Sequence, residues 1–202
     1  LDRLDRAPLA SAEQARVLEA LAALVPQHDL VICSDYQLGL LTAPVVARVR
    51  ELCRAHGALF CVDAQGSSHL YAGADLFRCN NREAEAALGA PLRDEADYQA
   101  GLARLRAELG ARLVIVTRGP EGLSLAGEGQ PYAYIPAARA SEVYDTTGAG
   151  DTFIAVASLA LAAGLDALSA AHMANAAAAL VVRRYGNAVV TPAELAAALR
   201  AY

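Results

Sequence analysis

The feature that most restricts the fold of this 202-residue sequence is a regular alternation of short apolar runs with amphipathic helical segments. The apolar runs, which suit buried strands, cover residues 30–33, 59–62, 75–79 and 113–116. Apolar side chains recur at helical spacing over residues 12–24, 42–57, 82–88 and 95–109. Apolar strands that alternate with helices are typical of a mostly parallel sheet covered on both faces. The sequence therefore predicts a three-layer α/β fold.

The rest of the chain predicts an antiparallel edge and a helical C-terminal third. The expected elements are a β-hairpin over residues 123–126 and 132–135, and helices over 149–163, over 167–185 up to Gly186, and from 191 onward. Capping boxes at residues 11–14 and 191–194 mark the starts of the first and last helices. No linker or internal repeat divides the sequence, so residues 1–202 are expected to form a single domain.

Composition excludes several classes of function. The formal charge of −5 provides no basic surface for nucleic acid. No uncharged apolar run reaches the roughly 18 residues of a membrane span, and no segment resembles a signal peptide, so we expect a cytoplasmic protein without a membrane partner. The four cysteines lack CxxC spacing and lie in apolar patterns, which indicates reduced core thiols.

Polar residues lie at or beyond the ends of the apolar runs. They are Asp35, Asp63, Asn80, Thr117 and Asp145. Open parallel sheets bind their ligands at the carboxyl ends of the strands. These residues are therefore the first candidates for a binding site.

Residues 145–152, with the sequence DTTGAGDT, lead into the long apolar helix expected from residue 149. The first amides of a helix lack intrahelical partners and lie at the positive end of its dipole, and glycine lets an anion approach them closely. Asp151 lies at the mouth of such an anion site. As a structural residue it would cap the helix. As a functional residue it would accept the proton of a hydroxyl that attacks a phosphoryl group.

The stretch DTTGAGDT followed by an apolar helix resembles the signature of the ribokinase-like (PfkB) carbohydrate kinases, and SEVYDTTGAGDT resembles the heptose-7-phosphate kinase branch. The resemblance implies a three-layer αβα fold with an antiparallel edge hairpin. It also implies that Asp151 is the catalytic base and that the amides of Gly148, Ala149 and Gly150 form the anion hole. No GxxxxGK[ST] pattern occurs in the sequence, so a P-loop kinase is not the competing interpretation.

Two further segments gain a functional interpretation beside this motif. Asn80 and Glu83 suit an ordinary helix start, but they resemble the family's NxxE element, which implies a place near the phosphates and Mg²⁺, through water. Thr117, Gly119 and Gly122 suit a tight turn, but they resemble the family's TxGxxG loop, which implies contact with ATP.

Two single residues complete the sites that the resemblance implies. Asn175 stands in an alanine-rich helix, where it would either face solvent or need a partner, and the family places such an Asn near the adenine. The family also implies a monovalent cation such as K⁺ beside the loop that contains Asp145. ATP, Mg²⁺ and K⁺ are thus the expected small partners.

The sequence departs from the family pattern at two positions and in length. Leu38 and Gln65 replace lysines that are usual in the heptose kinase branch, and no neighbouring arginine evidently replaces them. The chain opens on LDRLDR, which resembles the return from the family's lid. It is therefore expected to be the C-terminal, nucleotide-binding portion of the fold, without the N-terminal strands and the lid.

Together, these features predict an ATP-dependent phosphotransferase that moves the γ-phosphate of MgATP to a hydroxyl of a sugar or sugar phosphate. A homodimer is compatible with this function. Two alternatives stay open. The missing N-terminal part and the replaced lysines favour a non-catalytic nucleotide-binding module. The other alternative keeps the kinase activity and changes the acceptor to a nucleoside or another non-phosphorylated acceptor.

Overall fold

The computed structural model describes residues 6–138 and 144–200. The opening segment likened above to a lid return lies almost entirely outside the described residues. The sheet has six strands in the order β1-β2-β3-β4-β5-β6. They are β1 (Leu30–Asp35), β2 (Leu59–Ala64), β3 (Leu76–Asn80), β4 (Leu113–Thr117), β5 (Leu123–Gly127) and β6 (Gln130–Ile135). Strands β1 to β4 are parallel, and β5 and β6 form the predicted antiparallel edge hairpin.

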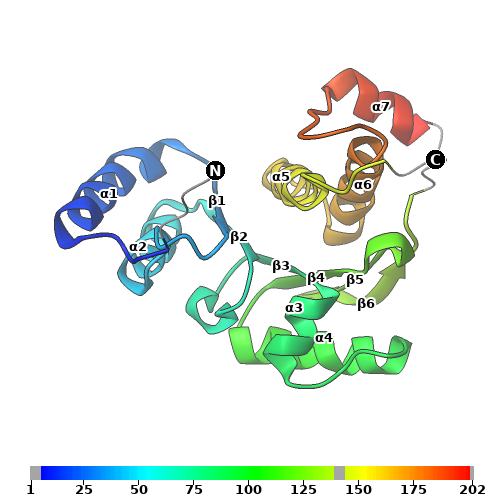
Figure 1. The fold of residues 1–202 in the computed structure, drawn as a ribbon, viewed down its shortest axis with the longest axis horizontal. Helices are drawn as coiled ribbons and strands as arrows, with labels where there is room; N and C mark the ends of the chain where they lie inside the picture. Colours follow the sequence, from blue (N-terminus) through cyan, green and yellow to red (C-terminus); the bar gives the residue numbers. More distant parts are fainter. Residues whose placement is uncertain (1–5, 139–143, 201–202) are drawn as a thin grey trace.

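The helices alternate with the parallel strands and then fill the C-terminal third, as predicted (Figure 1). The α-helices are α1 (Ser11–Leu24), α2 (Ala43–His56), α3 (Asn81–Leu88), α4 (Glu95–Leu109), α5 (Ala149–Ala162), α6 (Ala167–Val181) and α7 (Pro192–Arg200). Three short 3-10 helices are η1 (Val25–Gln27), η2 (Ser68–Tyr71) and η3 (Gly119–Glu121).

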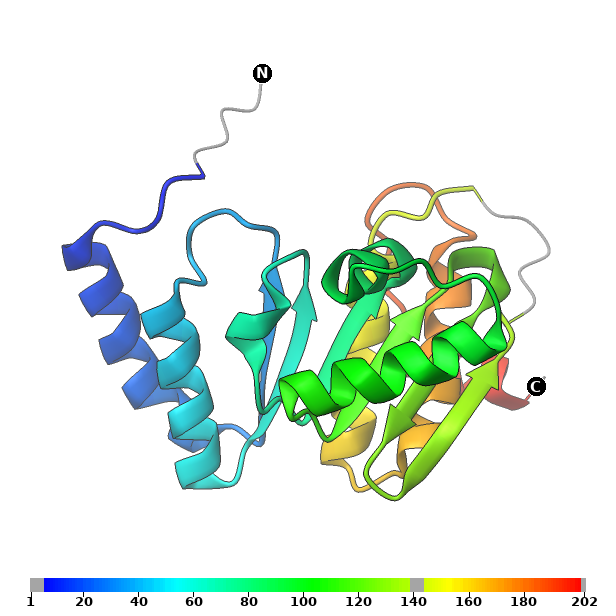
Figure 2. The same cartoon turned by 90° about the horizontal axis from the view of Figure 1, so that it is seen from below.

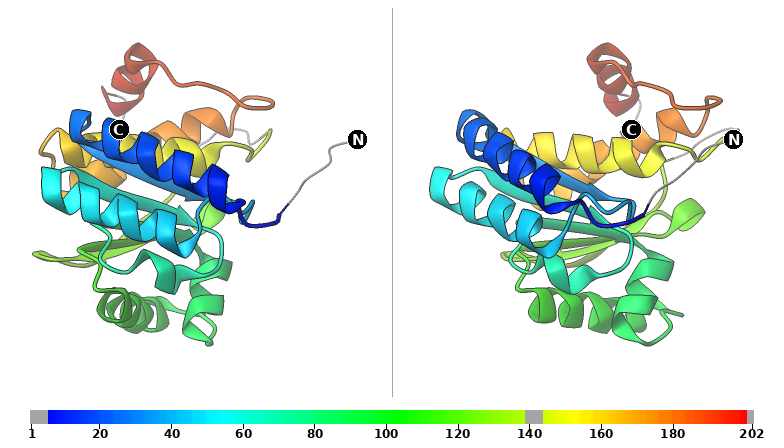
Figure 3. Two further views of the ribbon diagram at one scale, coloured as in Figure 1. Left: turned by 90° about the vertical axis from the view of Figure 1, so that its left-hand side faces the viewer. Right: turned by 60° about the vertical axis from the view of Figure 1, so that its left-hand side comes forward.

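The helices form two layers on opposite faces of the sheet. One core joins α2, α3 and α4 to one face, and the other joins α5 and α6 to the opposite face. Figure 2 shows α4 in front of the strands and α5 behind them. Figure 3 shows α1 beside α2 at the β1 end of the sheet, and α7 at the outer side of α6. The predicted three-layer α/β fold is confirmed.

Strand alternation decides which side chains face α5. Successive strand residues point to opposite faces, and Cys61, Leu76 and Ile115 pack in the core beneath α5. Two residues further along the same strands, the sheet places Asp63, Arg78 and Thr117. Ser34 of β1 pairs with Asp63 in the parallel register. Four polar side chains thus gather on one face at the carboxyl ends of the strands.

Two helix boundaries differ from the prediction. Ser11 is not the cap of α1; Ala10 precedes the helix and its N–H donates to Glu13 Oε2 at 3.2 Å, so the helix begins one residue earlier. Helix α6 ends at Val181 rather than near residue 185, because the carbonyl of Val182 accepts the N–H groups of Tyr144 and Asp145. The predicted capping box of α7 is confirmed.

All four cysteines are free and buried, as predicted. Burial raises the pKa of the Cys61 thiol to about 11. No helix in the described part of the chain combines the length and the apolar character needed to cross a membrane.

Candidate functional site

The first turn of α5 presents backbone amides at the carboxyl ends of the parallel strands. Gly148 precedes the helix in a left-handed conformation, with φ of 77°. The N–H of Ala149 donates to Thr146 O at 3.3 Å, so this member of the predicted anion hole already has a partner. Gly150 leaves no room for a side chain, because a Cβ there would lie 2.8 Å from Arg78 Nη1. The helix start is thus built against an arginine.

Asp151 does not cap α5, because Gly148 holds the cap position and offers no side chain. Its carboxylate is exposed and instead accepts a hydrogen bond from Tyr36 Oη at 2.6 Å and a longer one from Ser34 Oγ at 3.5 Å. The bond to Asp151 raises the pKa of Tyr36 to about 12, which keeps the phenol protonated at neutral pH. The carboxylate is therefore positioned to accept a proton from a hydroxyl. Sequence reasoning did not assign Ser34 or Tyr36 to the site.

Arg78 is the cation that sequence reasoning missed. Its Nη1 lies 2.8 and 2.9 Å from the two carboxylate oxygens of Asp63, and its Nη2 donates to Thr117 Oγ1 at 2.7 Å. Burial raises the pKa of Asp63, and the attraction of Arg78 offsets that rise only in part. Strand β3 carries Arg78 to the face that also holds Asp63 and Thr117. The expectation that no neighbouring arginine replaces the family's lysines stays a prediction. A charged residue within the apolar run 75–79 was the available signal.

The replaced positions themselves lie in the segments after β1 and β2. Leu38 is exposed, and the side chain of Gln37 donates to the carbonyl of Gln65. The hydrogen bond between Gln37 and Gln65 joins the two segments.

Asn80 and Glu83 bind each other at the start of α3. Glu83 N–H donates to Asn80 Oδ1 at 3.0 Å, and Asn80 N–H donates to Glu83 Oε2 at 2.7 Å, which is the capping geometry. Burial raises the pKa of Glu83. Its other carboxylate oxygen, Oε1, fits one water of a hydrated Mg²⁺ ion. The described residues hold no cluster of three metal-ligating side chains, so such an ion would depend on the phosphates for most of its ligands.

The loop between β4 and β5 is fixed by Arg118. Its guanidinium bonds to Glu95 at 2.5 Å and to Glu121 at 3.1 Å, and it lies 3.9 Å from the ring centre of Tyr98. Gly122 has φ of 108°, and a Cβ there would lie 2.1 Å from the carbonyl oxygen of Ile135. The contacts of Arg118 and the close packing at Gly122 hold this loop in one conformation. Thr117, at the start of the loop, points to Arg78.

Asp145 joins the segment before α5 to the segment after α6. Its Oδ1 accepts from Thr147 N–H and Oγ1 at 2.9 and 2.7 Å, and its Oδ2 accepts from Gly186 N–H at 3.0 Å. The hydroxyl of Thr147 is the main reason that the pKa of Asp145 is lowered. This ionised carboxylate fits one ligand of a monovalent cation.

Asn175 and Asp35 have structural partners. Asn175 is buried in α6, and its Nδ2 donates to Pro136 O at 2.8 Å. Asp35 points to the opposite face of the sheet, where it accepts from Tyr71 Oη at 2.6 Å. Asp35 is thus not brought to Asp151 with the other strand-end residues.

Two curated proteins similar to this chain carry the name bifunctional protein HldE. The chain is 37% identical over 201 residues to the bifunctional protein HldE of Trichlorobacter lovleyi, and the match covers 98% of this chain and 40% of that protein. It is 40% identical over 199 residues to the bifunctional protein HldE of Caulobacter vibrioides, with the same two coverages of 98% and 40%. The chain therefore spans about 40% of the length of these relatives.

Solved structures with this fold include the Arabidopsis thaliana ribokinase complexed with ribose and ATP, at a TM-score of 0.75 and 22% identity over 96% of this chain and 60% of that one. Phosphofructokinase-2 from Escherichia coli in complex with potassium aligns with a TM-score of 0.83 and 16% identity over 96% and 63% of the two chains. Finally, a profile of the pfkB family carbohydrate kinases matches residues 5–194. The chain belongs to the pfkB family of carbohydrate kinases.

Proposed function

We propose that the protein containing this chain is an ATP-dependent phosphotransferase that moves the γ-phosphate of MgATP to a hydroxyl of a sugar or sugar phosphate. One observation carries the proposal. The exposed carboxylate of Asp151 accepts a hydroxyl hydrogen bond at 2.6 Å beside a helix N-terminus whose amides have no side-chain cap. A base and an anion site are thus adjacent, as phosphoryl transfer requires.

In this proposal the acceptor hydroxyl takes the place of the Tyr36 hydroxyl at Asp151. Asp151 accepts the proton of this hydroxyl while the oxygen of the hydroxyl forms a bond to the γ-phosphorus. The bond between that phosphorus and the bridging oxygen breaks, and ADP leaves with the electron pair. The amides of Gly148, Ala149 and Gly150 would stabilise charge on the transferring group. For Ala149 this requires its N–H to exchange Thr146 O for the phosphate.

The remaining predicted residues would hold the nucleotide. Mg²⁺ supplies charge neutralisation at the phosphates when it is bound, and Glu83 with Asn80 would orient its waters. The fixed loop with Thr117, Gly119 and Gly122 would contact ATP, as predicted from sequence. We retain Asn175 near the adenine and Asp145 beside a cation as parts of the proposal. A single nucleotide-binding portion over residues 1–202 belongs to it as well.

The acceptor class follows from the relatives. Proteins named bifunctional protein HldE match 96–98% of this chain at 34–40% identity, which favours a heptose-7-phosphate-like acceptor. Leu38 and Gln65 replace two lysines of that branch. A screen of phosphorylated and non-phosphorylated sugars with the intact protein distinguishes the two acceptor classes.

The test is Asp151→Asn in the intact protein. We expect phosphoryl transfer to fall by about 10²- to 10⁴-fold, because proton transfer to a positioned base contributes that much. Calorimetry should show MgATP binding within about threefold of wild type, since the proposed role of Asp151 is proton transfer. Asp166→Asn is the matched control, because Asp166 caps α6 and Asn caps equally well. Equal activity of wild type and Asp151→Asn would refute the proposal.

A further inference from the structure

The guanidinium of Arg78 lies directly against the start of α5. A Cβ at position 150 would lie 2.8, 3.2 and 3.3 Å from its Nη1, Nη2 and Cζ atoms, so the group packs against Gly150 along much of its length. The side chain is 13% exposed and its partner Asp63 is 10% exposed. An ion pair this deeply buried lies under the amides that the proposed function assigns to phosphate.

The hydrogen bonds of Arg78 are incomplete. A guanidinium carries five N–H donors. In this structure Nη1 serves Asp63 and Nη2 serves Thr117, but Nε is buried and has no hydrogen-bond partner among the described residues. An unpaired buried donor is costly, and native proteins rarely leave one without water or a ligand. The site therefore has donor capacity that the chain itself does not use.

The charges around Arg78 favour an incoming anion. The N-terminus of α5 carries partial positive charge and faces the same guanidinium. Asp63 meets that cation through Nη1 alone, which leaves Nε of the guanidinium without an acceptor among the described residues. Residues 1–202 contain no lysine, so the permanent side-chain cations within them are arginines.

We propose that Arg78 binds the transferring γ-phosphoryl group from the strand side of residues 148–150, with Asp63 and Thr117 holding its guanidinium in place. This inference rests on the proposed kinase function and adds a phosphate-binding residue to it.

The experiment compares nucleotides that differ in the γ-phosphate. Calorimetry with the intact protein measures the affinities of Mg²⁺ complexes of AMP-PNP and ADP for wild type and for the double variant Asp63→Asn, Arg78→Met. The double variant removes both charges, so no buried charge is left unpaired. We expect the affinity for MgAMP-PNP to fall by about 10- to 100-fold, the range of charge-assisted hydrogen bonds, and that for MgADP by less than about threefold.

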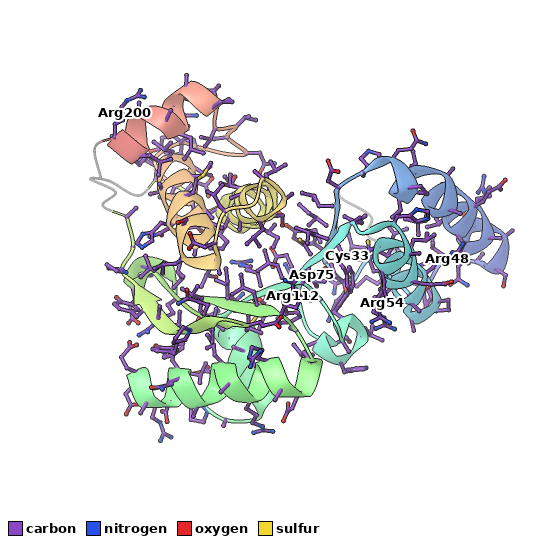
Figure 4. All side chains as sticks on the ribbon, turned by 180° about the vertical axis from the view of Figure 1, so that it is seen from behind. Cys33, Arg48, Arg54, Asp75, Arg112 and Arg200 are labelled. Carbon is purple, nitrogen blue, oxygen red and sulfur yellow. The ribbon has the colours of Figure 1, made fainter. Side chains whose placement is uncertain are left out.

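Arg112→Met is the matched control. Arg112 pairs with Asp75 at 3.1 Å just before the amino ends of β4 and β3, and Figure 4 shows the two residues side by side. We expect it to keep the wild-type ratio of the two affinities. Arg78→Lys should restore part of the MgAMP-PNP affinity, because it keeps the charge.

The outcomes distinguish failure of the Arg78 proposal from failure of the kinase proposal. Parallel loss of both nucleotides, or an unchanged ratio, in a double variant that unfolds as cooperatively as wild type would refute the Arg78 proposal and leave the kinase function standing. Wild type that binds neither nucleotide would overturn both. A selective loss of MgAMP-PNP supports both.

Discussion

Arg78 on β3 and Arg118, the residue that follows β4, lie at the carboxyl ends of neighbouring parallel strands, and their surroundings differ. All three guanidinium nitrogens of Arg118 have hydrogen-bond partners, from Glu95, Glu121 and Ser124. The guanidinium carbon of Arg118, Cζ, also lies 3.9 Å from the ring centre of Tyr98 and 4.8 Å from that of Tyr134. Arg78 has one carboxylate, one hydroxyl and a buried nitrogen without a partner among the described residues. Each guanidinium nitrogen of Arg118 therefore has a hydrogen-bond partner in the chain, whereas Nε of Arg78 has none among the described residues.

The carboxylates beside these arginines report the same difference. The pKa of Glu95 is lowered, chiefly by its hydrogen bond from Tyr132 and further by Arg118. The pKa of Asp63 is raised, because burial outweighs Arg78. In the Arg118 cluster, the charges are compensated by groups of the chain itself, which is typical of a structural ion-pair cluster. A cluster that holds buried charges with incomplete compensation is suited to binding a further charged group.

The largest expected effect concerns Arg78→Met alone. Removing one partner of a buried ion pair leaves the other charge uncompensated, which costs roughly 3–5 kcal/mol. Urea denaturation should show this loss in the free energy of unfolding. The double variant Asp63→Asn, Arg78→Met should recover most of it. If the single and double variants are equally unstable, the pair is not the source of the cost.

Arg118→Met is expected to have a smaller effect on stability, about 2 kcal/mol, because the partner glutamates remain half-exposed and hydrated. Urea denaturation measures it. The affinities for MgAMP-PNP and MgADP should fall together, since the variant loosens the whole loop over residues 118–122. A selective loss of MgAMP-PNP in this variant would erase the proposed distinction between the two arginines.

The smallest effect is the pH dependence of stability. The folded pKa of Glu95 lies below its usual value of 4.5, so its contribution is present above pH 4.5 and is lost as the pH falls through the lower folded value. Asp63 acts in the opposite sense, because its raised pKa makes the folded state bind a proton first as the pH falls. Glu95→Gln should flatten the acid loss of unfolding free energy, whereas Glu19→Gln, at an exposed position of α1, should not. Identical acid profiles for Glu95→Gln and wild type would contradict this assignment.

The sequence by itself determined the layers of the fold and the start of α5. Apolar runs at residues 30–33, 59–62 and 113–116 predicted buried parallel strands, because only a sheet covered on both faces hides such runs from water. The glycines and small residues of DTTGAGDT predicted a helix start with open amides, because the requirement is local to that turn. Local rules of this kind need no knowledge of distant contacts.

Only the tertiary structure decided which side chains meet at that helix start. Strand register places Asp63 beside Arg78 across 15 residues of sequence, and Asp151 meets Tyr36 across 115. Sequence reasoning therefore found Asp151 but missed its hydroxyl partner and the cation beneath it. It also carried Asp35 into the candidate site, although strand alternation turns that carboxylate to the other face. Contacts between strands depend on register and facing, and these are settled only when the layers pack.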